Sequence, residues 1–338
     1  MKKLMTITAL AVASIMTLTA CGGSKPAETT AAAAAPAAAG GMEGGTSLTF
    51  TTGGDQGTYY GFGGVLAGKI GETTSTKVTA ITSGGSKANI EALEAGDAQI
   101  GFVQSDVMAY AAEGTRLFEE SGAVTTFSTV ADLYMEQVQI VTLDPQIKTV
   151  ADLKGKNVSI GAAGSGVYFN AIDVLEAYDL TESDIYPTYQ SFGDSVEALQ
   201  DGKIDAAFVV AGAPTTAITS LVATRNIYML SLDDEHINKL IEKSPYYSKN
   251  VIPKTAYNTQ SDVTTVAVGA VIIANDDVSE ADVYNFLYGI FENKDAITTA
   301  HAKGKELDLT FASSVTSVPY HPGAVKYFKE KGIEVPAK

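Results

Sequence analysis

The 338-residue sequence contains one cysteine and no tryptophan. The single thiol, Cys21, cannot form an intrachain disulfide or a cysteine-based metal cluster. Histidine is also scarce. His236, His301 and His321 show neither the spacing of an HExxH metal motif nor an order that suits a Ser/His/Asp triad. We therefore predict no catalytic centre, no cofactor and no metal site, and we interpret His321, which precedes Pro322, as a helix start or another structural element.

Arginine is nearly absent, and basic residues are outnumbered. Arg116 and Arg225 are the two arginines, and neither lies in a glycine motif that could form a site. A bidentate arginine clamp on a carboxylate is therefore not expected. The formal net charge of −16 argues against nucleic acid as a partner and leaves no basic surface for anionic lipid. Any anionic ligand must be held by local groups against an unfavourable overall field.

The N-terminal residues carry targeting signals. Residues 1–20 are predicted to be a signal peptide, because Lys2 and Lys3 precede an apolar stretch too short to span a bilayer. Small residues before Cys21 resemble the bacterial lipobox, in which signal peptidase cuts before the cysteine and the cysteine, now N-terminal, is lipidated. The alternative is an ordinary secretory signal with an incidental cysteine. Residues 21–46 are rich in Ala, Gly and Pro and predict a tether. We expect an extracytoplasmic protein anchored to the cell membrane by its lipid.

The remaining body contains a pseudo-repeat. The segment NIEALEAGDAQIGFV (89–103) matches SVEALQDGKIDAAFV (195–209), and in both an amphipathic helix ends at a glycine before a buried strand. Each copy reads as a βαβαβ unit, so we predict an α/β fold of two open lobes. Ligands bind such sheets beyond the carboxyl ends of their strands, so facing lobes predict a shared cleft. The predicted strands are 48–52, 77–82 and 98–103 in the first copy, and 157–160, 185–189 and 204–210 in the second.

Two further segments are predicted to be hinge strands that pair and join the lobes. Tyr134–Leu143 alternates apolar and polar residues, and Val263–Ala274 is a long β-branched run. On this basis lobe 1 comprises residues 47–136 and 267–338, and lobe 2 comprises residues 137–266. The C-terminal part predicts helices over 280–292, on to His301, and over 322–331, packed on lobe 1.

The first candidate wall of the cleft is the stretch LTFTTGGDQGTYYGFGGVL (48–66). It predicts a strand, a glycine loop and a helix capped by Thr58, and a helix N-terminus with free N–H groups favours anions. Its predicted ligand-binding residues are Gly54, Gly57, Thr58, Tyr59 and Tyr60. The alternative is a tight turn followed by tyrosines that only pack in the core. A dinucleotide site is disfavoured because GGDQG is not GxGxxG.

Other candidates follow glycines or buried strands. In lobe 2, GAAGSG ends at a second helix N-terminus, where the Ser165 hydroxyl and backbone N–H groups could hold a carboxylate. Several of these side chains have structural alternatives: Ser86 and Asp106 could cap helices, Lys87 could be solvated, and Tyr168 and Tyr189 could pack in the core. The further predicted ligand-binding residues are Ser86, Asn89, Gln104, Ser105, Ser165, Gly166, Val167, Tyr189 and Pro214.

Ordered motifs along residues 47–337 carry a resemblance to a known family. They are TTGGDQGTYY (51–60), TSGGSKAN (82–89), QSD (104–106), LKGKNVSIGAAGSG (153–166) and VPYHPGAVKYF (318–328). In this set the chain resembles the TAXI-type solute receptors of tripartite ATP-independent periplasmic (TRAP) transporters. The glycine motifs are weak singly, but their order with the YHPGA ending is specific. Lys87 stands where the family commonly has an apolar residue, and Val167 stands where it usually has Thr. The resemblance therefore does not fix the identity of the ligand.

The resemblance implies a type II periplasmic-binding-protein fold and a role in transport. Such a receptor captures a small solute outside the membrane and delivers it to TRAP permease subunits, driven by an ion gradient, commonly Na⁺. Family members are associated with glutamate, glutamine and related C5 dicarboxylates. The alternatives are a clamshell ligand sensor or surface antigen not coupled to transport and, ranked last for want of catalytic residues, a secreted enzyme.

Overall fold

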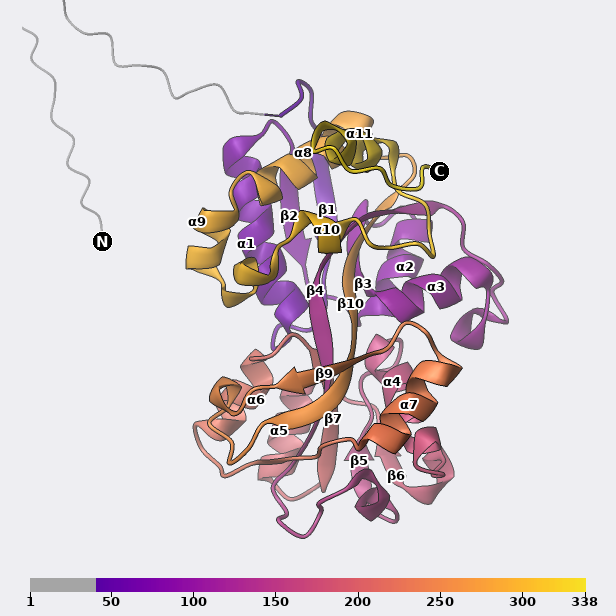
Figure 1. The fold of residues 1–338 in the computed structure, drawn as a ribbon, viewed down its shortest axis with the longest axis vertical. Helices are drawn as coiled ribbons and strands as arrows, with labels where there is room; N and C mark the ends of the chain where they lie inside the picture. Colours follow the sequence, from indigo (N-terminus) through magenta and orange to yellow (C-terminus); the bar gives the residue numbers. More distant parts are fainter. Residues whose placement is uncertain (1–40) are drawn as a thin grey trace, which may run out of the picture. The chain divides into compact units, whose positions relative to one another are not determined.

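The computed structural model describes residues 41–338, whose strands form one continuous sheet in the order β2-β1-β3-β10-β4-β7-β5-β6 (Figure 1). Strand β8 is added to β4, and β9 to β10. The predicted signal peptide, Cys21 and the tether up to residue 40 lie outside the described residues. No helix in the described part of the chain is both long and apolar enough to span a membrane.

Lobe 1 is built on parallel strands β1 (Ser47–Thr51), β2 (Lys77–Ile81) and β3 (Ile100–Gln104). Helices α1 (Thr58–Thr73), α2 (Ser86–Glu94) and α3 (Ser105–Glu113) follow these strands in turn. The C-terminal helices α8 (Glu280–Phe291), α9 (Lys294–Ala300), α10 (Leu309–Ala312) and α11 (Pro322–Glu330) belong to the same lobe, and α8 packs on α1 and α11. Phe50, Phe62 and Phe102 are fully buried in its core.

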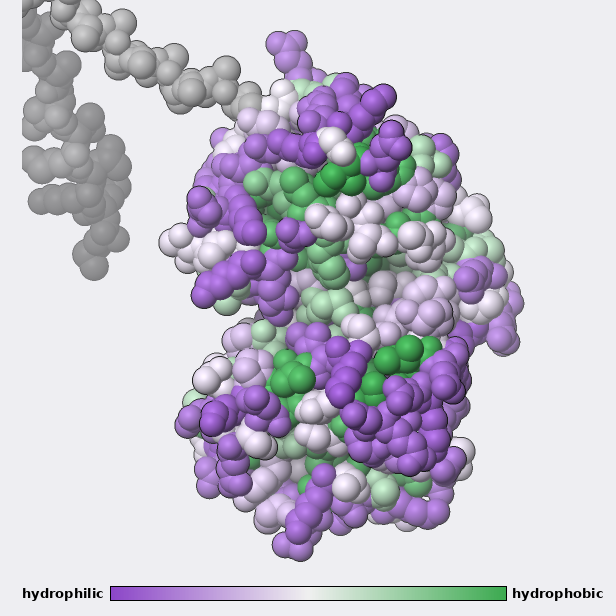
Figure 2. All heavy atoms as spheres, in the orientation of Figure 1, coloured by the Kyte–Doolittle hydropathy of each residue, from purple (hydrophilic) through white to green (hydrophobic). Residues whose placement is uncertain are grey.

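Lobe 2 repeats this plan with parallel strands β5 (Asn157–Ser159), β6 (Tyr186–Thr188) and β7 (Ala206–Ala211). Its helices are α4 (Gly166–Ala177), α5 (Phe192–Gln200), α6 (Thr216–Val222) and α7 (Asp234–Lys243), with strands β8 (Tyr228–Met229) and β9 (Ser248–Ile252). Short 3₁₀ helices lie at Arg116–Phe118, Val150–Leu153, Glu182–Asp184, Lys254–Ala256 and Ala302–Glu306. Figure 2 shows hydrophilic side chains over much of the visible face of both lobes, with smaller hydrophobic groups between them.

Strands β4 (Phe127–Thr142) and β10 (Val263–Asn275) pair in antiparallel fashion and run through both lobes. β10 pairs with β9 over Val263–Ala267 and with β3 over Ala270–Ala274, while β4 pairs with β7 over Gln137–Thr142. The predicted strand Tyr134–Leu143 starts too late, because β4 begins at Phe127. Residues 127–133 read FSTVADL and lack the apolar–polar alternation that identified the second half, although the whole strand except Met135 is buried.

The two parallel α/β units, joined by two crossing strands, confirm the predicted type II periplasmic-binding-protein fold. The predicted tether, by contrast, is too long at its C-terminal end. The Met42 N–H donates to Asn285 Oδ1 at 2.7 Å, and the Thr46 N–H donates to Asp282 Oδ1 at 3.0 Å. Asp282 and Asn285 are buried in α8, so residues 42–46 belong to lobe 1.

Two helical glycines test the packing of lobe 1. A Cβ at Gly289 of α8 would lie 2.8 Å from the Ile70 Cα of α1, whereas a Cβ at Gly64 would meet nothing within 4 Å. Alanine in an open helix position stabilises by about 0.5–1 kcal/mol, and overpacking costs about 1–3 kcal/mol. We expect Gly64→Ala to raise the free energy of unfolding in urea and Gly289→Ala to lower it. Equal effects would contradict the close approach of α1 and α8.

Candidate functional site

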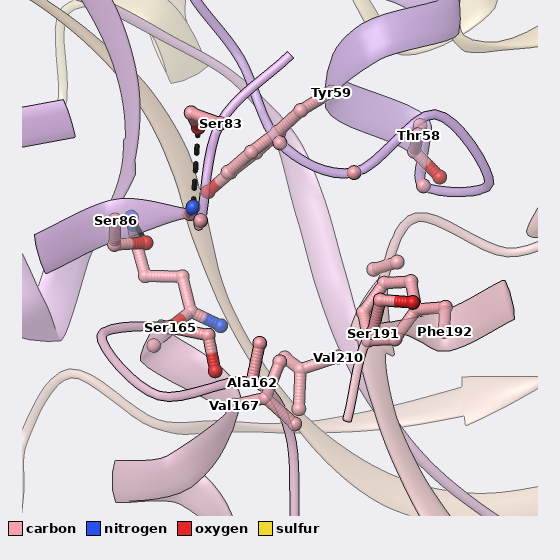
Figure 3. A pocket seen from close by; sticks show the side chains of 18 of the residues that line it. Thr58, Tyr59, Ser83, Ser86, Ala162, Ser165, Val167, Ser191, Phe192 and Val210 are labelled. Carbon is pink, nitrogen blue, oxygen red and sulfur yellow. Dashed lines mark hydrogen bonds between the residues drawn. The ribbon is translucent and has the colours of Figure 1, made fainter. Parts of the chain in front are cut away.

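A cavity with about 600 Å³ of atom-free space, part of it open to solvent, lies between the lobes (Figure 3). Lobe 1 lines it with the loops that lead into α1 and α2 and with the end of β3. Lobe 2 lines it with the corresponding loops before α4 and α5 and with the end of β7. The lining residues are Gly53, Gly54, Gly57, Thr58, Tyr59, Ser83, Gly84, Gly85, Ser86, Gln104, Glu136, Ala162, Ser165, Gly166, Val167, Gln190, Ser191, Phe192, Val210 and Ala211.

Helix N-termini from both lobes meet at this cavity. The N-cap residues of α1, α2, α4 and α5 are Gly57, Gly85, Ser165 and Ser191, and all of them line it. The first N–H groups of a helix lack intrahelical partners, and the helix dipole adds positive potential there. The cavity is therefore polarised to receive an anion although no Lys, Arg or His is among its lining residues.

Several buried polar atoms at the cavity have no hydrogen-bond partner. They are the Tyr59 hydroxyl, Gln104 Oε1 and Ser165 Oγ. The Tyr59 ring stacks on Phe102 with centroids 4.5 Å apart, which fixes the direction of the hydroxyl, and Figure 3 shows Tyr59 reaching in from lobe 1 opposite Ser165 and Val167. Leaving such groups unpaired costs about 1–3 kcal/mol each, so they are the atoms that a bound ligand would satisfy.

Glu136 of β4 places a carboxyl group in the cavity lining, where it is 2% exposed. Burial raises the pKa of Glu136 to about 8, and the nearby Tyr59 hydroxyl and Lys303 ammonium oppose this rise only in part. Lys303, itself buried, donates to Glu306 Oε1 at 2.6 Å. No basic residue lines the cavity beside Glu136, so its carboxyl is largely protonated at neutral pH, and a positively charged ligand group would favour its ionised form.

Most of the residues predicted from the sequence meet at this cavity: Gly54, Gly57, Thr58, Tyr59, Ser86, Gln104, Ser165, Gly166 and Val167. Two of them act differently from the prediction. Thr58 does not cap α1, whose N-cap is Gly57; its hydroxyl instead donates to the Gly212 carbonyl of lobe 2 at 2.8 Å. Ser86 does not cap α2 either, and its Oγ accepts the Gln104 N–H at 3.1 Å.

The remaining predicted residues, Tyr60, Asn89, Ser105, Tyr189 and Pro214, lie outside the lining. Tyr60 and Pro214 are exposed at the surface. Asn89 is fully buried and its amide donates to the Thr52 and Phe102 carbonyls, which ties α2 to the sheet. The Ser105 hydroxyl accepts the Gly269 N–H, and the exposed Tyr189 hydroxyl donates to Glu182. None of these five residues is among those that line the cavity.

The other side chains considered from the sequence have structural roles. His321 is the N-cap of α11, where its Nδ1 accepts the Gly323 N–H, which confirms the predicted helix start. Lys87 pairs with Glu91 one turn along α2, and the Tyr168 hydroxyl donates to Glu182. Asp106 does not cap α3; its Oδ2 accepts the Asn170 amide.

The pseudo-repeat contained a signal for residues that the sequence reasoning missed. Its offset of 106 residues, from Asn89 to Ser195, equates Gly85 with Ser191 and Gln104 with Val210, and all four line the cavity. Carrying the first copy's site onto the second would have identified Gln190, Ser191 and Phe192. No comparable signal marks Glu136, because it lies within a strand and faces the cavity only through the tertiary fold.

Direct contacts join the lobes around the cavity. Gln104 Nε2 donates to Asn170 Oδ1 at 2.9 Å, and Asn170 Nδ2 donates to Asp106 Oδ2 at 2.9 Å. Arg116 of lobe 1 pairs with the buried Asp173 of lobe 2. Burial raises the pKa of Asp106 to about 7, although the Val107 N–H and the Asn170 amide oppose the rise. The lobes are therefore held together on this side by buried polar contacts.

The model of the NMT1-like family matches residues 50–332 of this chain. Among solved structures, the alkanesulfonate-binding protein SsuA from Xanthomonas axonopodis pv. citri bound to MOPS is 16% identical, with a TM-score of 0.48, over 84% of this chain and 90% of that one. The GluR0 ligand-binding core from Nostoc punctiforme in complex with L-glutamate is 14% identical, with a TM-score of 0.47, over 77% of this chain and 99% of that one.

The buried Glu136 carboxyl predicts a pH-dependent stability difference. Its pKa in the folded protein, about 8, lies above its value in the unfolded chain. The folded state therefore keeps a proton that the unfolded chain loses, and the free energy of unfolding falls as pH rises towards 8. We expect Glu136→Gln to match wild type near pH 5 and to exceed it by at least about 1 kcal/mol at pH 9. Urea unfolding at both pH values measures this, with the exposed Glu94→Gln as the control. A difference that does not grow with pH would contradict the burial of a charged Glu136.

Proposed function

This chain belongs to the NMT1-like family, and from that premise we propose that it is an extracytoplasmic solute receptor whose two lobes enclose a small carboxylate. The observation that supports this most is the convergence of the N-termini of α1, α2, α4 and α5 on a cavity with buried, unpartnered polar atoms. An anion there gains N–H partners from both lobes. The arrangement suits binding, and we propose no catalytic role.

Within this function, we propose the TAXI subtype and delivery of the solute to TRAP permease subunits. The proposal rests on the ordered motifs that end in YHPGA. Lipidation at Cys21 would hold the receptor at the membrane surface. Of the two departures from the family pattern, Val167 lines the cavity and Lys87 forms an ion pair with Glu91 outside it, so Val167 is the one that we expect to affect the choice of solute.

The cavity also bears on which carboxylate it takes. The helix N-termini provide for an anionic group, whereas the buried Glu136 carboxyl, once ionised, favours a positively charged group beside it. A ligand with an amino group near Glu136 would neutralise that carboxyl. Among glutamate, glutamine and C5 dicarboxylates, we therefore favour the amino acids.

Binding and closure are coupled in this proposal. The ligand groups would bridge Thr58, Tyr59 and Gln104 of lobe 1 to Ser165 and Ser191 of lobe 2, contacts that exist only when the lobes are together. A solute that makes these contacts only in the closed form shifts the equilibrium from the open form towards the closed one. The closed form is then what a permease would recognise; a sensor not coupled to transport would use the same closure.

The ligand is identified by thermal-shift screening of residues 41–338 against amino acids, dicarboxylates, short alkanesulfonates and sugars. The protein should start at residue 41 because residues 42–46 bind α8. A ligand at a hundredfold excess over its Kd stabilises the native state by about 2.7 kcal/mol. A shift with an amino acid or C5 acid supports the proposal. If sugars alone shift the melting temperature, the carboxylate receptor is excluded.

Removing one hydroxyl at a time tests the site. Tyr59→Phe keeps the stacking on Phe102 but removes a buried, unpartnered hydroxyl from the cavity, so we expect the Kd of the identified solute to rise about tenfold, or 1.4 kcal/mol. Ser165→Ala should have a similar effect. Tyr189→Phe is the matched control, since that hydroxyl contacts Glu182 outside the cavity. Unchanged affinity in both cavity variants, measured by calorimetry, would exclude this site.

A further inference from the structure

A second cavity, with about 770 Å³ of atom-free space partly open to solvent, lies against the paired strands β4 and β10. Lobe 1 contributes Ser105, Phe311 and residues 314–317, lobe 2 contributes residues 245–248, and the crossing strands contribute Asp132, Met135 and Gly269. It shares no lining residue with the cavity between the helix N-termini. In Figure 1, α10 and β9, which flank these segments, lie in front of the β4–β10 pair.

A bulge in β4 turns Asp132 towards this second cavity. Gly269 pairs with Met135 but Val271 pairs with Asp132, so β4 holds one residue more than β10 between these pairs. The extra residue reverses the alternation of side chains, which places Asp132 on the same face as Met135 and opposite to Glu136. Gly269 leaves room for the carboxyl, because a Cβ there would lie 2.1 Å from Asp132 Oδ2.

Asp132 has no neutralising partner among the described residues. The residue is 5% exposed, and its Oδ1 is buried without a hydrogen bond. Burial raises the pKa of Asp132 well above its usual range, and the N–H groups of Ala270 and Leu133 oppose this only in part. A buried carboxyl of this kind costs the fold free energy unless a cation or a proton neutralises it.

The other walls of the cavity offer acceptors and an aromatic ring. The Ser314 hydroxyl donates to the Phe311 carbonyl at 2.7 Å and the Ser248 hydroxyl to the Ala267 carbonyl at 3.4 Å, so their lone pairs remain available. Tyr246 adds an aromatic ring to the lining, a group whose face attracts cations. No Lys, Arg or His is among the lining residues, so no side chain of the cavity itself supplies positive charge.

We propose that this second cavity is a binding site for a small organic ammonium ion, with its charged group on Asp132 and its apolar body against Met135, Tyr246 and Val315. A divalent metal ion is disfavoured, because no group of three or more acidic, His or Cys side chains that could hold one exists in residues 41–338. A carboxylate is disfavoured by Asp132 itself. The space also exceeds that of a bare ion, and an alkyl chain would fill it.

An occupant of this site would act on the hinge. It contacts both lobes and the crossing strands, so its contacts change whenever the lobes move relative to one another. Binding here and binding between the helix N-termini are then linked, and each ligand changes the other's affinity by the same factor. The site itself does not depend on which solute the first cavity takes.

The test uses n-butylammonium chloride with the purified protein and follows its melting temperature. Wild type should show a saturable rise beyond that given by sodium chloride at equal ionic strength, and n-butanol should not reproduce it. Asp132→Asn, which keeps the shape of the side chain, should weaken binding at least tenfold. Tyr246→Leu should weaken it less. Circular dichroism at room temperature checks that each variant is folded.

Glu136→Gln separates the two cavities, because it alters the first and leaves the second intact. The affinity for butylammonium should be unchanged in Glu136→Gln and at least tenfold weaker in Asp132→Asn. The opposite pattern, the same shift with n-butanol, or no saturable shift in wild type would each overturn the proposal. These results do not depend on the carboxylate screen, so the failure of one proposal is distinguishable from the failure of the other.

Discussion

The pairing of β4 with β10 is the constraint on which the rest of the structure depends. Each strand belongs to both lobes, so the sheet is continuous across the molecule and the helix N-termini of the two lobes face one space. The same pair carries Glu136 to one side and, through its bulge, Asp132 to the other. Burying two acids on the crossing strands lowers the stability of the fold. Such destabilising groups are typical of functional sites rather than of purely structural elements.

In the proposed function, the first cavity would attract an anion without using basic side chains. In a chain with a net charge of −16, long-range electrostatics would repel an anionic ligand, and it is the N–H groups of helix N-termini that offset this at close range. Backbone donors are fixed by the fold and need no side-chain ordering, so little entropy is lost when the ligand binds. The scarcity of arginine in the sequence is thus consistent with the way the site is built.

Much of this fold could be predicted from the sequence, because hydrophobic periodicity and the glycine that ends each helix report local structure directly. The pseudo-repeat gave the two α/β units, and the glycine loops gave three of the helix N-termini at the cavity. Side-chain direction could not be predicted as well. Ser105 follows the lining residue Gln104, yet its hydroxyl bonds Gly269, since one residue along the chain changes the face; Asn89, on the same helix as Ser86, bonds the sheet instead. The bulge that places Asp132 depends on pairing between strands far apart in the chain.

The anchoring of residues 42–46 on α8 also has a mechanical consequence. Thr46 bonds Asp282, and β1 begins at the next residue, inside the sheet of lobe 1. A force that pulls on the chain ahead of Met42 would load these hydrogen bonds and the β1 ladder along the strand, where many bonds resist together. It would not pass through β4 and β10. In a protein held by its N-terminus, lobe 1 would therefore be the fixed body. Lobe 2 would move when the cleft opens, and the pull on the N-terminus would not act on it.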